Sequence, residues 1–105
     1  GIKSDDTLWC WGDNQYGQTG YGGTTDQTAP ARVVDNDDTW LSISLGQYHA
    51  CGRKSDGSSW CWGQNTQGQL GDGTKTDSRI PVLVTTGDGN YSAIAAGNYY
   101  TMGIR

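Results

Sequence analysis

The sequence predicts an all-β protein, and three observations lead to that fold class. Seventeen of the 105 residues are glycine, and all eleven acidic residues are aspartate, which prefers turns and caps to helix interiors. Five tryptophans and six tyrosines favour short strands joined by tight turns. Residues 60–71 repeat the sequence pattern of residues 9–20 at a spacing of 51 positions, so the chain contains a tandem repeat.

The repeat extends over the whole chain. Residues 1–51 align with residues 52–102 without a gap, and twenty-one of the 51 aligned positions are identical. Residues 103–105 then restart the pattern, since they have the glycine, isoleucine and basic residue of positions 1–3. We therefore expect a single domain over residues 1–105 that holds two structural repeats, 1–51 and 52–102.

Short strands follow one another within the repeat, and the unit is clearest between residues 40 and 84. The first predicted strand ends at Gly46, and the fourth begins with Pro81, which suits a strand start or a sheet edge. The predicted elements are strands at 40–45, 48–54, 58–62 and 81–85, a turn at 55–57, and a long polar, glycine-rich loop at 63–77.

Four short strands in about 50 residues are typical of one blade of a β-propeller. The sequence opens near the third strand of one unit and stops after the second strand of another. We therefore expect blades of four antiparallel strands, with one intact blade between two complementary half-blades that are completed by oligomerisation.

The acidic balance of the chain argues against two classes of partner. Its formal net charge is −4, which disfavours binding to nucleic acid or to an anionic membrane surface. No run is long or apolar enough to span a bilayer, and no signal peptide pattern is present. We predict neither a nucleic-acid nor a membrane partner.

The glycine-rich loop belongs to a longer pattern that occurs twice. In the second repeat, residues 62–73 read Trp-Gly-Gln-Asn-Thr-Gln-Gly-Gln-Leu-Gly-Asp-Gly and residues 81–84 read Pro-Val-Leu-Val. At the end of the first repeat, residues 46–50 read Gly-Gln-Tyr-His-Ala, and an Asp-Gly turn follows at 56–57. This pattern resembles the repeat of the regulator of chromosome condensation family over essentially the whole chain. The signature positions are Trp9, Trp11, Gly12, Asn14, Gly17, Gln18 and Gly20 in the first repeat and Trp60, Trp62, Gly63, Asn65, Gly68, Gln69 and Gly71 in the second.

The resemblance implies a β-propeller, with seven blades in the founding members of the family. The founding member is a nucleotide-exchange factor for a small GTPase that docks on chromatin, and exchange there depends on a wedge projecting from one blade. Both repeats here are 51 residues long, without an insertion for a wedge or a basic tail. A plant ultraviolet receptor of the family uses a Gly-Trp-Arg-His-Thr motif, whereas Gln47 and Tyr48 fill the Trp and Arg places here.

The glycine-rich and acidic stretches have structural interpretations that we prefer to binding sites. The loop at 68–73 has no helix after it, as a phosphate-binding loop requires, so its glycines are expected to make turns that asparagine and glutamine side chains hold. The acidic segments 35–38 and 87–90 are interpreted as solvated turns, with calcium binding as the alternative. Residues 90–92 fit a glycosylation sequon. The tryptophans are expected to pack between blades, with their N–H groups bonded to loop carbonyls.

The only histidine and two of the three cysteines are the remaining candidates for chemistry. His49 and Cys51 lie on one face of a strand, with Cys61 across the hairpin, so zinc binding and a Cys–His nucleophile are alternatives. Neither is favoured, because the spacing matches no known zinc pattern and no catalytic constellation repeats. We predict no catalytic residue, no metal and no cofactor, and hence no enzyme.

The predicted hairpin register pairs two cysteines. A three-residue loop at 55–57 makes residue 51 face residue 61, at a separation that a disulfide tolerates. We predict a Cys51–Cys61 disulfide, which suggests an extracellular or secreted protein; localisation is otherwise unknown. Cys10 has Met102 in its partner position, 102 residues further on, and is predicted to be a free thiol packed against Met102 of another copy.

The half-blades predict association between copies of the chain. The strand of Tyr100 and Met102 corresponds to the second strand of a blade, and the strand of Trp9, Cys10 and Trp11 corresponds to the third. These two strands are therefore expected to pair. A head-to-tail contact of this kind closes into a ring if the rotation allows, and three or four chains would give six or eight blades. The rival explanation is that the sequence is a piece of a longer propeller.

These patterns predict a non-catalytic binding or scaffold module that assembles into a ring through a shared blade. Exposed aromatics and amides make a lectin-like carbohydrate binder the first alternative. A guanine-nucleotide exchange factor for a small GTPase is the second alternative, which the missing wedge disfavours. The predicted partners are copies of the chain itself, and a protein or a glycan is a further candidate ligand.

Overall fold

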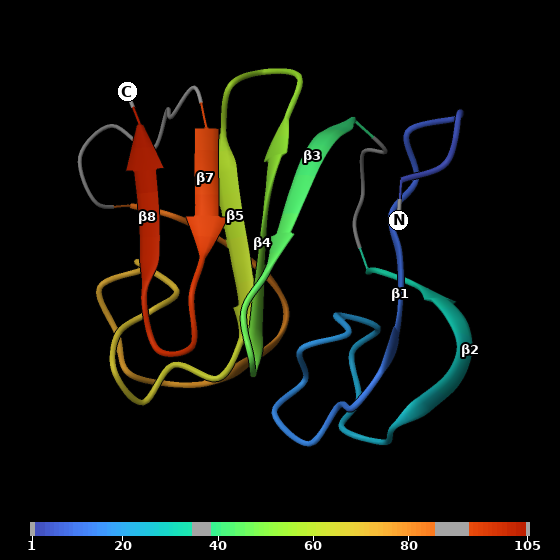
Figure 1. Cartoon of the computed structure of the whole chain (residues 1–105), viewed down its shortest axis with the longest axis horizontal. Helices are drawn as coiled ribbons and strands as arrows, with labels where there is room; N and C mark the ends of the chain where they lie inside the picture. Colours follow the sequence, from blue (N-terminus) through green and yellow to red (C-terminus); the bar gives the residue numbers. More distant parts are fainter. Residues whose placement is uncertain (1, 35–38, 86–92, 105) are drawn as a thin grey trace.

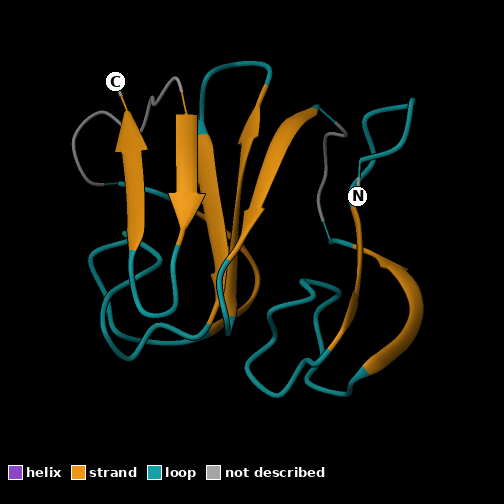
Figure 2. Ribbon diagram, viewed as in Figure 1, coloured by secondary structure: helices purple, strands orange, loops and turns teal. Residues whose placement is uncertain are grey.

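The computed structural model describes residues 2–34, 39–85 and 93–104, which contain eight strands and no helix (Figure 2). The strands are β1 (Trp9–Gly12), β2 (Gln27–Arg32), β3 (Trp40–Leu45), β4 (His49–Lys54), β5 (Ser59–Gly63), β6 (Ser78–Leu83), β7 (Ala93–Ala96) and β8 (Thr101–Ile104). The acidic segments 35–38 and 87–90, for which calcium is the alternative to a solvated turn, and the sequon at 90–92 lie outside the described residues. The described segments hold no helix suited to crossing a membrane.

The strands form three antiparallel sheets, of which the middle one is a complete blade. β3, β4, β5 and β6 pair in sequence order into a four-stranded meander. The β1–β2 pair lies on one side of this blade, and the β7–β8 pair lies on the other side (Figure 1). The predicted all-β fold, with one intact blade between two half-blades, is therefore confirmed. Completion of the half-blades by oligomerisation stays a prediction.

The turn between β4 and β5 determines the register of the intact blade. Gly57 has a φ of 89° and donates its N–H to the Lys54 carbonyl over 3.0 Å. This left-handed residue closes the expected three-residue loop. The resulting register places Cys51 opposite Cys61.

The fourth strand of the blade differs from its predicted bounds. β6 starts at Ser78 and ends at Leu83, so Pro81 lies inside the strand rather than at its start. Among the described residues β6 is the edge of the sheet and pairs with β5 alone, so its outer side needs no backbone donor and tolerates a proline. The other three strands agree with the prediction to within one residue at each end.

A buried asparagine holds each long loop between the third and fourth strands of a repeat. Asn65 accepts the Leu70 N–H at 2.9 Å and donates to the carbonyls of Thr74 and Thr76 at 3.0 and 3.1 Å. Asn14 makes equivalent bonds in the first repeat, and both side chains are fully buried. These bonds satisfy backbone groups that regular secondary structure does not pair, so the loops have a defined shape.

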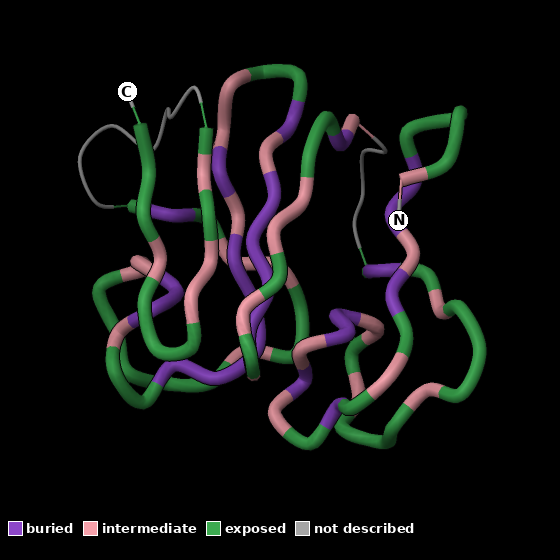
Figure 3. The backbone as a smooth tube through the Cα atoms, in the orientation of Figure 1, coloured by how far each residue is buried: buried purple, intermediate pink, exposed green. Residues whose placement is uncertain are grey.

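The described residues form two core clusters, one on each face of the intact blade, and buried residues concentrate in β4 and β5 (Figure 3). The cluster towards β1–β2 contains Leu8, Cys10, Val33, Trp40, Ala50 and Trp62. The cluster towards β7–β8 contains Cys51, Cys61, Leu70 and Val84, with Val82 and Ile94 packed against it. Side chains of β4 and β5 alternate between the two clusters, as the period of a strand requires.

A polar contact also joins β8 to the intact blade. Thr101 Oγ1 donates to the Gln69 carbonyl over 2.7 Å, and His49 Nε2 lies 3.0 Å from the same hydroxyl. Nε2 therefore carries the ring proton of neutral His49 and donates to Thr101. His49 Nδ1 is buried without a hydrogen-bond partner among the described residues. Burial lowers the pKa of His49, and the nearby Tyr100 backbone opposes this effect.

Replacement of Asn65 tests the role of the loop amide. We expect Asn65→Ala to lower the free energy of unfolding by about 2–4 kcal/mol, because buried backbone groups lose their partners. The control is Gln67→Ala in the same loop, whose exposed side chain should contribute within about 0.5 kcal/mol. Urea unfolding followed by tryptophan fluorescence measures both changes, and equal effects would contradict this role.

The Cys51–Cys61 disulfide, which the structure contains between two fully buried residues, is a prediction for the protein in solution. We expect alkylation of the unfolded, unreduced chain to label one thiol, that of Cys10, and labelling after reduction to reach all three cysteines. Intact mass measures the difference. Three labelled thiols without reductant would show that the bond is absent. A bond closing so short a loop should stabilise the fold by about 2–3 kcal/mol.

The lowered pKa of His49 predicts a loss of stability in mild acid. The unfolded chain binds the His49 proton at a pKa of about 6.5, and the folded chain binds it only at lower pH. This group therefore leaves stability unchanged above about pH 7 and reduces it as the pH falls towards the folded pKa. We expect the melting temperature to drop between pH 7.5 and 5.5, and the drop to be smaller in His49→Gln. An equal drop in the variant would rule out His49 as the cause.

Candidate functional site

The two repeats differ in burial at positions where their sequences correspond. Trp62 is 0% exposed, whereas its repeat equivalent Trp11 is 57% exposed. Cys51 is 0% exposed, whereas its equivalent Met102 is 62% exposed. Both exposed residues lie on half-blades, at positions that form the core in the intact blade. The candidate functional surface therefore comprises the exposed sides of the two half-blades.

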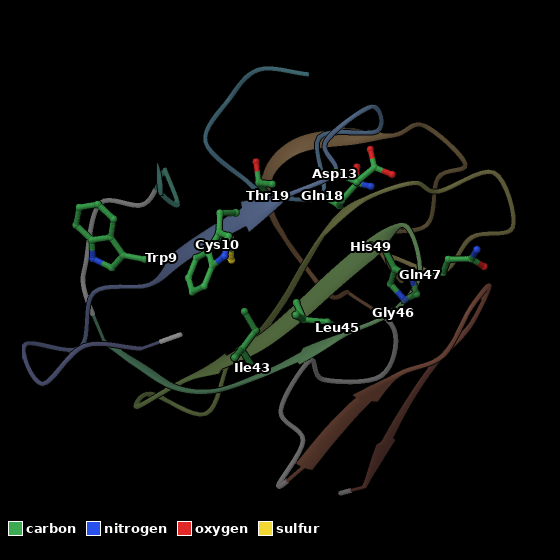
Figure 4. A pocket seen from close by; sticks show the side chains of 11 residues that line it. Trp9, Cys10, Asp13, Gln18, Thr19, Ile43, Leu45, Gly46, Gln47 and His49 are labelled. Carbon is green, nitrogen blue, oxygen red and sulfur yellow. The ribbon is translucent and has the colours of Figure 1, made fainter. Parts of the chain in front are cut away.

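A cavity of about 280 Å³ opens between β1 and β3 (Figure 4). Its walls are Trp9, Cys10 and Trp11 from β1, and Ile43 and Leu45 from β3. Asp13, Gln18, Thr19, Gly46, Gln47 and His49 complete the lining. We call this the β1 cavity; it combines apolar walls with amide and carboxylate groups.

A second cavity of about 290 Å³ lies beside β8, on the other face of the intact blade. Leu70, Gly71 and Val84, which lie in the loops after β5 and β6, form one side, and Ile94 of β7 and Thr101 of β8 form the other. Gln67, Gly68, Gln69, Tyr99, Tyr100 and Gly103 complete the lining. We call this the β8 cavity.

Each cavity adjoins a strand that has a partner on one side only. Within the described segments, β1 pairs with β2 and β8 pairs with β7. Their repeat equivalents in the intact blade, β5 and β4, also pair with each other. The structure thus places the predicted pairing residues Trp9, Cys10 and Trp11 on one open strand and Met102 on the other, while Tyr100 immediately precedes β8.

The cysteines and the histidine do not form a reactive centre. Cys10 is a free thiol in the wall of the β1 cavity, and burial raises its pKa, which disfavours the nucleophilic thiolate. His49 contacts Thr101, and the Cys51 sulfur is bonded to Cys61, so these residues do not make a base–nucleophile pair. No group of three or more His, Cys, Asp or Glu side chains in residues 2–34, 39–85 and 93–104 is arranged to hold a metal ion.

The signature residues build the scaffold around the cavities. The Trp60 indole donates to Ser58 Oγ over 2.8 Å, and Ser58 donates to Asp56 over 2.6 Å, which lowers the pKa of Asp56. Residues 5–9 form the same chain of bonds in the first repeat. The signature glycines Gly12, Gly17, Gly20, Gly63, Gly68 and Gly71 all have φ between 68° and 117°.

Sequence reasoning did not single out Val84, Leu45 or Thr101 as part of this surface. The identity of Val33 and Val84 between the repeats was a usable signal, since it marks a position that packs in both copies. Thr101 had no such signal, because its repeat equivalent is Ala50, which has no hydroxyl group.

A regulator of chromosome condensation (RCC1) repeat model matches residues 5–52 and 56–104, and a second model of this repeat matches residues 40–69. The chain is 33% identical to the ultraviolet-B receptor UVR8 of Arabidopsis thaliana, over 79% of this chain and 19% of the receptor. It is 35% identical to human protein RCC2, over 73% of this chain and 15% of RCC2. The chain thus spans about a fifth or less of these relatives.

Solved structures share the fold. Prp20p of Saccharomyces cerevisiae, characterised for its binding to Gsp1p and histones, superposes with a TM-score of 0.83 at 17% identity, covering 99% of this chain and 28% of Prp20p. Human WBSCR16 superposes with a TM-score of 0.78 at 23% identity, covering 95% of this chain and 27% of WBSCR16. Since the repeat models cover nearly the whole chain, the protein belongs to the RCC1 repeat family of β-propellers.

Proposed function

We propose that this chain is a non-catalytic propeller module that serves as a binding scaffold, and that its copies associate head to tail through a shared blade. The observation that carries the proposal is the contrast between Trp11, 57% exposed, and Trp62, 0% exposed. A residue type that is core in a complete blade lies at the surface of a half-blade. Pairing of the two half-blades would bury it.

The two open strands have complementary sequences, which supports a second copy as the partner. β8 is the repeat equivalent of β4, and β1 is the equivalent of β5; β4 and β5 pair within the intact blade. In one chain β1 and β8 lie on opposite sides of that blade, so they cannot meet (Figure 1). A contact between unlike surfaces of two copies is heterologous and builds rings when it closes.

Each chain contributes one intact blade and two halves. Three chains would therefore form six blades and four chains would form eight, and both numbers are within the usual four to eight blades of propellers. Such a ring presents the loops held by Asn14 and Asn65 repeatedly around its rim. Members of the family bind protein partners, as in the complex of yeast RCC1 with Kap60, so we propose a protein ligand for these loops.

Carbohydrate is the second candidate ligand, and it competes for the same space. The β1 cavity combines Trp9 and Trp11 with the polar side chains of Asp13, Gln18 and Gln47. Aromatic faces and amides suit sugar rings and hydroxyls. Glycan-array binding by the chain would favour this candidate.

A nucleotide-release assay tests the exchange-factor alternative, and an unchanged rate of nucleotide release from small GTPases would rule it out.

Size-exclusion chromatography with light scattering tests the association of copies. We expect a particle of three or four times the chain mass of 11.3 kDa at micromolar concentration, because the open strand of each copy would pair with the complementary strand of the next. A folded monomer under these conditions would overturn the proposal of a shared blade. The open surfaces would then be expected to contact repeats of a different protein or of a longer chain. Circular dichroism of the same fraction establishes that the material is folded.

A further inference from the structure

We propose a specific docking surface between two copies, which rests on the proposed association and defines its geometry. β8 of one copy pairs with β1 of the next in the register of β4 with β5. Met102 then faces Cys10, and the Trp11 side chain enters the β8 cavity of the neighbouring copy. The occupant of both cavities is a second copy of this chain.

The intact blade supplies the register. β4 pairs with β5 through His49↔Gly63, Ala50↔Trp62 and Cys51↔Cys61, and the Cα atoms of the two cysteines are 4.1 Å apart. A shift of one repeat converts these pairs into Tyr100↔Gly12, Thr101↔Trp11 and Met102↔Cys10 between two chains. The ladder stops near Leu8, because Ile2 of the same chain already faces Leu8.

Trp62 shows where Trp11 would lie. Its indole donates to the Gln18 carbonyl over 2.9 Å and lies against Gly20, where a Cβ atom would come within 2.8 Å of Nε1. That Cβ would also lie 3.0 Å from Val33, which forms the adjoining wall. A side chain at position 20 would therefore displace the indole.

The β8 cavity is lined by the repeat equivalents of the residues that form this hollow, and no indole is among its lining residues. Gln69, Gly71 and Val84 correspond to Gln18, Gly20 and Val33, and all three line the cavity. The Gln69 carbonyl accepts one bond from Thr101 and has a second lone pair for an indole N–H. Trp11 of a neighbouring copy has the matching ring, and it is exposed.

Met102 fits the β1 cavity of the neighbouring copy by the same argument. Its equivalent Cys51 packs in a cluster with Ile94 of the next sheet. The equivalent of Ile94 is Ile43, which forms a wall of the β1 cavity beside Cys10. A flexible thioether is well suited to fill this gap.

The glycine turns give independent support for a neighbouring copy beside the second loop. A Cβ at Gly17 would lie 2.6 Å from Arg79 Cα, and Gly22 donates its N–H to the Arg79 carbonyl over 3.2 Å. The equivalent glycines, Gly68 and Gly73, have only open space within 4 Å of the same Cβ position. The equivalent of Arg79 is Thr28, so β2 of the neighbouring copy fits beside this loop.

Disulfide trapping tests the register on the full chain. We expect Met102→Cys to join Cys10 of another copy under mild oxidation and to give covalent multimers on a non-reducing gel, with the linked peptides identified by mass spectrometry. Tyr100→Cys and Ile104→Cys are matched controls, because both positions are exposed and lie two residues to either side of Met102. Each would link only if the strand had slipped by two residues.

Every outcome of trapping decides the register. Links at position 102, with few at 100 and 104, support it. Links mainly at position 100 or 104, or an assembled particle without links at any of the three, overturn it while leaving the proposed association intact. A particle that light scattering shows to be monomeric overturns the association itself.

Replacement of Trp11 tests the β8 cavity separately. We expect Trp11→Ala to raise the dissociation constant between copies by about tenfold or more, as for other aromatic anchors that fill a pocket. Val34→Ala is the control, because Val34 is exposed and its equivalent Thr85, which follows the last strand of the intact blade, is exposed as well. Equal, small effects of the two substitutions would show that Trp11 does not enter the cavity.

Discussion

The packing of one tryptophan into the preceding repeat is the interaction on which the rest of the structure depends. The Trp62 ring fills a hollow formed by the loop after β1, with its N–H bonded to the Gln18 carbonyl at 2.9 Å. Its other side meets the Trp40 ring edge-on at a centroid distance of 5.6 Å. The indole thus buries a large apolar surface while its one polar group stays bonded, so it joins two blades without leaving an unpaired donor.

That packing makes neighbouring repeats depend on each other. The glycine-rich loop that forms the hollow is held by Asn14, which accepts the Thr19 N–H at 2.9 Å and donates to the Thr25 carbonyl at 3.0 Å. The stability of such proteins is approximately a sum of repeat terms and contacts between neighbours. The small aliphatic content of each sheet matters less in this arrangement, because the core lies between sheets rather than within one.

Packing between neighbouring repeats also accounts for the exposed apolar residues of the half-blades. Trp11 and Met102 have the side chains of core positions but lack the adjoining strands that would cover them. Their repeat equivalents, Trp62 and Cys51, are fully buried in the intact blade, so the exposure reflects the surrounding strands and not an unusual local sequence. Completion of a blade would bury both residues at once, so association and the final packing of the half-blades would be coupled.

The sequence by itself determined the all-β class, the repeat and the hairpin register that sets Cys51 opposite Cys61, because these depend on turn chemistry and on identity between copies. It did not determine the start of β6, since Pro81 is tolerated there only because the strand has one partner. Of the candidate site, it indicated β1 and the strand of Met102 but not the cavities. Only the tertiary structure decided that Trp62 is buried and Trp11 exposed, because burial depends on the adjoining blade and not on the residue's own repeat.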